Sequence, residues 1–161
     1  NCQIFHKRTA MIHIPQNDYE WWSFFTAYCR DKFLKYSRKG KPIWEAMYLA
    51  YEQTIELRTI PGLETRFNSV NFEVKDKWAE KYDKVVTTLY FNTDPDKVRF
   101  CEQCGFPMVE GYYLAGEFAC CDECCLKAYG GDKEQMEEDL SHADEPDGEC
   151  YWTEWDKVEF N

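Results

Sequence analysis

Cysteine is the residue type whose number and spacing could do chemistry in this chain of 161 residues. Nine cysteines are present, and six of them lie between positions 101 and 125, in the stretches "CEQC" and "CCDECC". An odd number of cysteines cannot all pair within one chain, and clustered cysteines in a reducing compartment more often bind a metal than form disulfides. The distribution therefore predicts a metal site.

The two stretches have the spacing of tetrahedral zinc ligands. Cys101 and Cys104 form a C-x2-C turn, which lets two thiolates reach one ion at about 2.3 Å. The residues leave two choices for the second pair: Cys120 with Cys124, one helical turn apart, or Cys121 with Cys124, a second C-x2-C. Four thiolates fill a tetrahedron and leave no position for water, so we expect structural zinc and predict no catalytic residue.

Short elements are expected to position these cysteines. The segment 109–113 and the segment 117–119 have the form of a hairpin, with Ala115 and Gly116 at its turn. A short helix should follow, since Asp122 and Glu123 suit its N-terminal end. Turn, hairpin and helix together predict a treble-clef-like or ribbon-like zinc finger over residues 96–130.

Helical patterns dominate the chain before this finger. Aromatic residues at three-to-four spacing, an Asn17 cap and Gly40 after a basic end predict a helix over 18–38. A second helix should start after Pro42 and stop at Pro61, and a third should cover roughly 75–90 after a short strand or loop at 70–74. The predicted fold class is α+β, with a mainly helical N-terminal body over 1–95.

The C-terminal segment, residues 131–161, holds nearly all of the net charge of −11, because twelve of the 30 acidic but only two of the 19 basic residues lie there. Such a segment repels phosphate and attracts basic protein surfaces, so we expect no direct binding to nucleic acid or membrane. "YWTEW" indicates order, because its aromatic rings either pack on the body or anchor a partner. The predicted partner-binding residues are Glu134, Glu137, Glu138, Asp139, Asp144, Glu145, Asp147, Glu149, Trp152 and Trp155.

The second cysteine stretch resembles a known signature. "FACCDECCL" is similar to the F/Y-C-S-D-E-C-L pattern of FCS/MYM-type zinc fingers, with Cys121 in the place of the usual serine and Cys125 in the place of an apolar residue. This resemblance selects Cys120 and Cys124 to complete the site with Cys101 and Cys104. Residues 99–156, from "CEQC" to "YWTEW", also look like small phage and mobile-element proteins that carry such a finger; residues 1–95 resemble no family.

These patterns lead to one leading functional hypothesis and two alternatives. Composition and resemblance together favour a non-catalytic, zinc-stabilised acidic phage protein that inhibits a basic nucleic-acid-handling host protein, such as a restriction nuclease or CRISPR effector. The alternatives are a zinc-finger nucleic-acid binder or regulator, which would use the basic stretch 30–41, and a structural module of a larger assembly. No apolar stretch suggests a signal or membrane span, so the expected location is the cytoplasm of an infected or element-carrying bacterium, with the oligomeric state left open.

Overall fold

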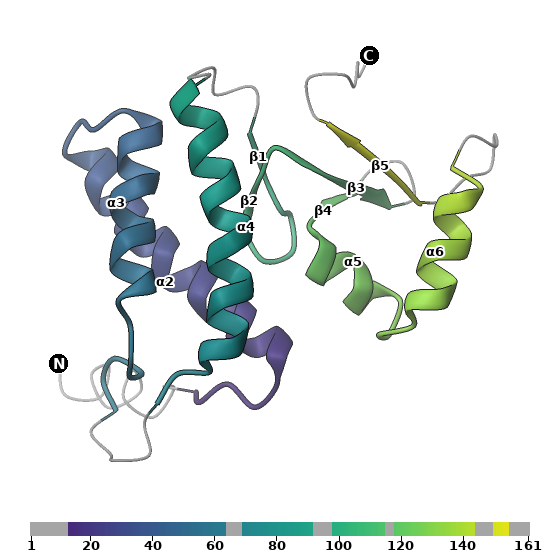
Figure 1. Ribbon diagram of the computed structural model, residues 1–161, viewed down its shortest axis with the longest axis horizontal. Helices are drawn as coiled ribbons and strands as arrows, with labels where there is room; N and C mark the ends of the chain where they lie inside the picture. The colour runs from purple at the N-terminus through teal and green to yellow at the C-terminus, as the bar shows by residue number, and fades with distance from the viewer. Residues whose placement is uncertain (1–12, 64–68, 92–97, 115–117, 144–149, 155–161) are drawn as a thin grey trace, which may run out of the picture.

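A computed structural model describes residues 13–63, 69–91, 98–114, 118–143 and 150–154 of the chain. These residues form a mixed α+β fold with two parts, a helical body and a smaller part rich in cysteine (Figure 1). The body consists of α2 (Asp18–Arg38), α3 (Ile43–Ile55) and α4 (Phe72–Phe91). The second part, which we call the cysteine module, consists of β1 (Arg99–Phe100), β2 (Pro107–Met108), β3 (Glu110–Leu114), β4 (Phe118–Cys120), α5 (Asp122–Ala128), α6 (Lys133–Ser141) and β5 (Cys150–Glu154).

Helix α2 begins and ends as its sequence predicts. The Asn17 side chain accepts a hydrogen bond from the Glu20 N–H at 2.9 Å and donates one to the Glu20 carboxylate, also at 2.9 Å. This arrangement resembles a capping box: the Asn17 oxygen satisfies the free Glu20 N–H of the first turn, and the Glu20 carboxylate holds the Asn17 side-chain amide. Gly40, with φ of +88°, follows the last turn. The predicted range 18–38 is confirmed.

The next two helices differ from their predicted bounds. Helix α3 ends at Ile55, six residues before its predicted stop at Pro61, and an isolated bridge between Thr59 and Ser69 follows it. Helix α4 begins at Phe72, where a strand or loop was expected. The Asn71 side chain accepts a hydrogen bond from the Val74 N–H at 3.2 Å, and this cap starts the helix earlier than the alternating apolar residues indicated.

Lys75 joins the second and third helices. Helix α3 has no basic residue in its last turn, but the Lys75 ammonium of α4 donates hydrogen bonds to the carbonyl oxygens of Ile55 at 2.8 Å and Leu57 at 2.7 Å. A cation at this end is favourable because the last carbonyls of a helix carry partial negative charge. Burial lowers the pKa of Lys75 from its ordinary value, and the nearby charge of Arg58 adds to this shift.

Aromatic side chains form the core between the three helices. Trp22, Phe25, Trp78 and Leu89 are fully buried, and the Trp78 indole N–H donates to the Thr26 hydroxyl at 3.1 Å. Trp78 also stacks on Tyr82, with ring centroids 4.7 Å apart. Aromatic rings of α2 and α4 thus form the centre of the body.

Two small antiparallel sheets shape the cysteine module. Strands β1 and β2 pair with each other, and the second sheet has the order β4-β3-β5. Pairing of Tyr113 with Ala119 confirms the predicted hairpin, whose turn at Ala115 and Gly116 lies outside the described residues. On its other edge, Tyr112 of β3 pairs with Trp152 of β5. The acidic C-terminal segment therefore contributes the third strand of this sheet.

The cysteine module packs directly on the body. Phe106 of the module lies against Trp22, Trp78 and Tyr82, with ring centroids 4.7–6.2 Å apart. Around this contact, three lysines of α4 pair with three acids of the module: Lys77 with Glu123, Lys81 with Asp122 and Lys84 with Glu110, each at 2.6 Å. A common apolar core and a row of ion pairs thus fix the module beside α4.

Candidate metal centre

The first two cysteines lie in the turn between β1 and β2. The Cys101 N–H donates to the Phe106 carbonyl and the Gly105 N–H to the Cys101 carbonyl, both at 2.8 Å. Gly105 has φ of +85°, a left-handed conformation that glycine adopts without steric cost. A side chain at Gly105 would also place its Cβ 3.1 Å from the Arg30 guanidinium. The turn thus brings Cys101 and Cys104 to the same side of the loop.

The other two cysteines lie at the start of α5. Cys121 has extended backbone angles and occupies the cap position, and its carbonyl accepts the Cys125 N–H at 2.8 Å. Cys124 lies in the first turn, three residues later. Asp122 lies between them in the first turn, where an acidic side chain is favourable.

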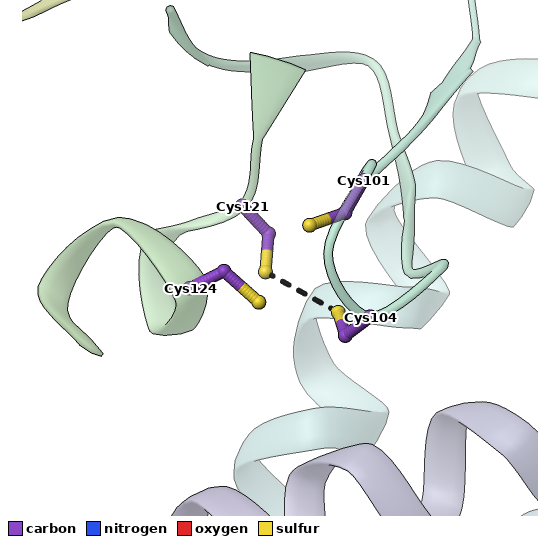
Figure 2. Close-up of side chains that lie close together, drawn as sticks. All are labelled: Cys101, Cys104, Cys121 and Cys124. Atoms are coloured by element: carbon purple, nitrogen blue, oxygen red, sulfur yellow. Dashed lines mark hydrogen bonds between the residues drawn. The ribbon is translucent and has the colours of Figure 1, made fainter. Parts of the chain in front are cut away.

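These four cysteines point toward one another (Figure 2). The Sγ atoms of Cys101, Cys104, Cys121 and Cys124 all lie within 4.8 Å of each other, and those of Cys104 and Cys121 are 3.7 Å apart. Around a tetrahedral zinc ion with Zn–S bonds of about 2.3 Å, sulfur atoms are about 3.8 Å apart. Three of the four residues are buried and Cys104 is half-buried. The group can therefore hold one metal ion away from water.

The structure corrects one predicted ligand. It brings Cys121, not Cys120, together with the other three cysteines. Cys120 is the last residue of β4, and successive residues of an extended chain point to opposite sides. Its thiol contacts Cys125 instead. The open alternative, a second C-x2-C made by Cys121 and Cys124, is the arrangement found.

Crowding alters how these four thiols ionise. Hydrogen bonds from the neighbouring thiols, first that of Cys104, lower the pKa of Cys101. The pKa of Cys121 is raised instead, chiefly because its thiol gives up a hydrogen bond to Cys101 on ionisation. The Cys104 and Cys121 Sγ atoms, 3.7 Å apart, are close enough for one thiol to donate a hydrogen bond to the other. A bound cation would favour the thiolate form of every ligand.

Tyr19 of α2 also reaches the site, which the sequence gave no means to predict. Its hydroxyl lies 3.2 Å from the Cys124 Sγ atom. Burial raises the pKa of Tyr19, and contact with Cys124 adds to the shift, so the phenol keeps its proton and can donate to a thiolate. The Lys127 ammonium lies 4.0 Å from the centre of the Tyr19 ring. Because Tyr19 is 105 residues from Cys124, only folding brings them together.

A second group of cysteines lies beside the first. The Cys125 and Cys150 Sγ atoms are 3.9 Å apart, and Cys120 contacts Cys125; all three residues are fully buried. Burial, together with the nearby Cys125, raises the pKa of Cys150 to about 12. Burial also raises the pKa of the separate Cys29 thiol, to about 11. Cys150 and Cys29 are therefore protonated at neutral pH and pack as small apolar side chains.

The predicted partner-binding residues fall into four sets. Glu134, Glu137 and Glu138 are exposed on α6. Asp139 is partly buried and accepts hydrogen bonds from the Tyr129 hydroxyl at 2.6 Å and from the Gln135 amide at 2.9 Å, so it supports the module itself. Trp152 is 47% exposed. Four acids and one tryptophan lie outside the described residues: Asp144, Glu145, Asp147, Glu149 and Trp155.

A cavity of about 160 Å³ lies between α4 and the module, next to the cysteine site. Its wall includes Trp22, Cys121 and Trp152. The lysines that line it, Lys81 and Lys84, are already paired with module acids. The lysines of the cavity wall are thus already engaged in the ion pairs that join body and module.

Comparison with protein-family models, curated proteins and solved structures gives no match for this chain. The resemblance of the cysteine module to FCS/MYM-type fingers and phage proteins therefore stays a prediction from its motifs. Within the described part of the chain, none of the helices has the length and apolar character needed to cross a membrane.

Proposed function

We propose that Cys101, Cys104, Cys121 and Cys124 bind one structural zinc ion in a treble-clef-like finger. Two ligands come from a tight turn and two from the start of a helix, with a hairpin between them, which is the order of elements expected of such a finger. Tetrahedral sites of four thiolates suit zinc, and a filled tetrahedron has no open position for a reacting water molecule. The zinc would hold α5 to the β1–β2 turn, and the proposed role is non-catalytic.

We further propose that the protein acts by binding another protein through the exposed acids of α6. The observation that carries this proposal is a contrast in ion pairing. The module acids that face α4, such as Glu110 and Asp122, are paired with lysines. Glu134, Glu137 and Glu138 are exposed, and no ion pair engages them within the described residues. Unpaired acids on one helix favour a basic partner surface.

The partner we propose is a basic protein that handles nucleic acid. Its lysines and arginines normally bind phosphate, and the acids of α6 would compete for them. The resemblance of residues 99–156 to phage proteins makes a restriction nuclease or a CRISPR effector in the bacterial cytoplasm the first candidate. Trp152, exposed on β5 of the same module, would supply an aromatic contact.

Direct binding of nucleic acid is the second candidate. The observation that favours it is the cluster of exposed bases at the end of α2, Lys35, Arg38 and Lys39. In Figure 1 this end of the body lies far from α6. Phosphate contacts there would not meet the acids, so the two functions can be separated by substitution.

A charge-neutralising variant tests the proposal. Glu134→Gln, Glu137→Gln and Glu138→Gln together should abolish capture of nucleic-acid-binding proteins from a nuclease-treated bacterial lysate, while metal content stays at one per chain. The matched control neutralises three exposed acids of α4, Glu73, Asp76 and Glu80, and should keep the captured proteins. Equal capture by both variants would contradict the role of α6. Binding of labelled DNA by the wild type at physiological salt would support the second candidate instead.

A further inference from the structure

The body carries an aromatic recess between α3 and α4. Its volume is about 290 Å³, and we define it by four aromatic residues and one acid: Trp44, Tyr48, Tyr51, Tyr90 and Asp83. The recess lies along the contact of α4 with α3, whereas the metal centre belongs to the module beyond α4 (Figure 1). It is therefore separate from the site described above.

The rings of the recess are held at fixed angles. Trp44 and Tyr90 meet edge to face, with centroids 5.4 Å apart and planes at 83°. Tyr51 stacks on Tyr82 at 5.6 Å, and Tyr82 stacks in turn on the buried Trp78. The core thus supports Tyr51, while Trp44 and Tyr90 support each other.

Two of the four aromatic residues, Tyr48 and Tyr90, are exposed, while Trp44 and Tyr51 are half-buried. Tyr90 is 59% exposed, and the adjacent Phe91 is 80% exposed. Contiguous exposed aromatic surface is typical of binding sites, because it gains stability when a partner covers it. The composition of the walls identifies which partner would fit.

Charge excludes a purely apolar ligand. Asp83 is exposed at the recess, no lysine or arginine lines it, and no ion pair engages Asp83 within the described residues. Burial raises the pKa of Tyr51, and the negative charge of Asp83 adds to that shift, so the carboxylate is near the ring. An apolar ligand would displace water from this carboxylate without replacing the hydrogen bonds that the water made. A cation would gain both from the carboxylate and from the faces of the rings.

We propose that the aromatic recess binds an arginine side chain presented by a protein partner. A guanidinium group is planar, stacks on aromatic faces and pairs with a carboxylate through two N–H groups, whereas an ammonium group is more strongly hydrated. The recess lies on α3 and α4 and uses no residue of α6. This proposal therefore does not depend on the acidic surface, and either can fail without the other.

Peptide titration followed by NMR tests the site. The probes are three peptides that differ at one position, Ac-Gly-Gly-Arg-Gly-Gly-NH2 and its citrulline and lysine counterparts, added to the full-length zinc-loaded protein. Citrulline keeps the planar shape of arginine but carries no charge. The arginine peptide should shift the indole N–H signal of Trp44 and the amide signals of Asp83 and Tyr90, and it should bind about tenfold more tightly than the citrulline peptide.

Two substitutions separate this site from general attraction to an acidic protein. Asp83→Asn should weaken arginine binding about tenfold without altering the dispersion of the spectrum. Asp76→Asn, which removes the same charge two turns earlier on α4, should leave binding within about twofold. Equal binding of arginine and citrulline, an unchanged affinity in Asp83→Asn, or shifts confined to α6 would each overturn the proposal. Tighter binding of the lysine peptide would overturn the choice of arginine.

Discussion

Replacing Cys121 with serine should remove one of four equivalent metal ligands. Structural zinc sites contribute about 10–16 kcal/mol of binding free energy, so one ligand in four contributes about 2.5–4 kcal/mol. That loss weakens the affinity by about two to three orders of magnitude, since 1.4 kcal/mol corresponds to a factor of ten. Because Cys121 is buried beside Cys104, with sulfur atoms 3.7 Å apart, water cannot readily replace the lost thiolate.

The matched control is Cys120→Ser, which differs by one position. Cys120 is fully buried against Cys125, so a serine hydroxyl there should lower the free energy of unfolding by about 1–3 kcal/mol. The Cys120 thiol is not one of the four that converge, and its hydrogen-bond partner is Cys125, so the zinc affinity should stay within about threefold. Competition with a chromophoric zinc chelator measures both affinities, and chemical denaturation of the zinc-loaded proteins measures both stabilities.

The opposite pattern would refute this assignment. If Cys120→Ser released the metal while Cys121→Ser kept it, the helical pair Cys120 and Cys124 would be the ligands. The register of β4 and α5 would then differ by one residue from the one described. Equal loss in both variants would indicate that the second thiol group, with Cys125 and Cys150, is part of the same centre.

Three further predictions concern the body, its contact with the module and the pH dependence of the metal. Lys75→Met should lower the free energy of unfolding by roughly 2–4 kcal/mol, because two charge-assisted hydrogen bonds to α3 are lost. The pKa of Lys75 in the folded protein lies below its ordinary value of 10.5, so the unfolded chain binds more protons at pH values just below 10.5. As the pH is raised through this window, the free energy of unfolding of the wild type should therefore increase relative to that of the variant, which denaturation at a series of pH values would measure. Lys81→Met should cost only about 0.2–1 kcal/mol and less at high salt, because its pairs with Asp122 and Glu123 are partly exposed. Acidification should release the metal to a fluorescent indicator, because protons compete with it for the thiolates.

Local signals in the sequence were sufficient to predict much of the fold. The Asn17 and Glu20 side chains lie three residues apart, and their capping interaction needs nothing beyond the first turn of α2. The hairpin of β3 and β4 and the short helix α5 are likewise formed by neighbouring residues. The bounds of α2 were predicted as found, those of the hairpin strands within one residue, and α5 only by its first residues.

Two features of the fold were not predicted: one depends on a local cap that overrides a strand-like pattern, and the other on pairing between distant segments. Val70, Phe72 and Val74 alternate like a strand, yet the Asn71 cap starts a helix that buries Val74 against the body. The strand Cys150–Glu154 pairs with β3 of the module, which the sequence did not predict, while Trp152 lines the cavity between module and body. Strand partners depend on the whole sheet, which no local pattern specifies.

The choice between Cys120 and Cys121 as a ligand depended on the exact residue at which β4 ends and α5 begins. Both lie within reach of Cys124 in sequence, and the resemblance to FCS/MYM-type fingers selected Cys120. The decisive feature is that β4 ends at Cys120 and α5 begins at Asp122, so Cys121 occupies the cap position. Element boundaries to the nearest residue are beyond what spacing can supply.

X-ray absorption at the zinc edge of the purified full-length protein tests the central claim most directly. We predict one zinc ion per chain with four sulfur neighbours at about 2.3 Å and no nitrogen or oxygen neighbour. Cys121→Ser should reduce the sulfur count to three, whereas Cys120→Ser should leave it at four. Wild-type protein prepared without chelator that contains no zinc, or zinc with oxygen or nitrogen neighbours, would contradict the account.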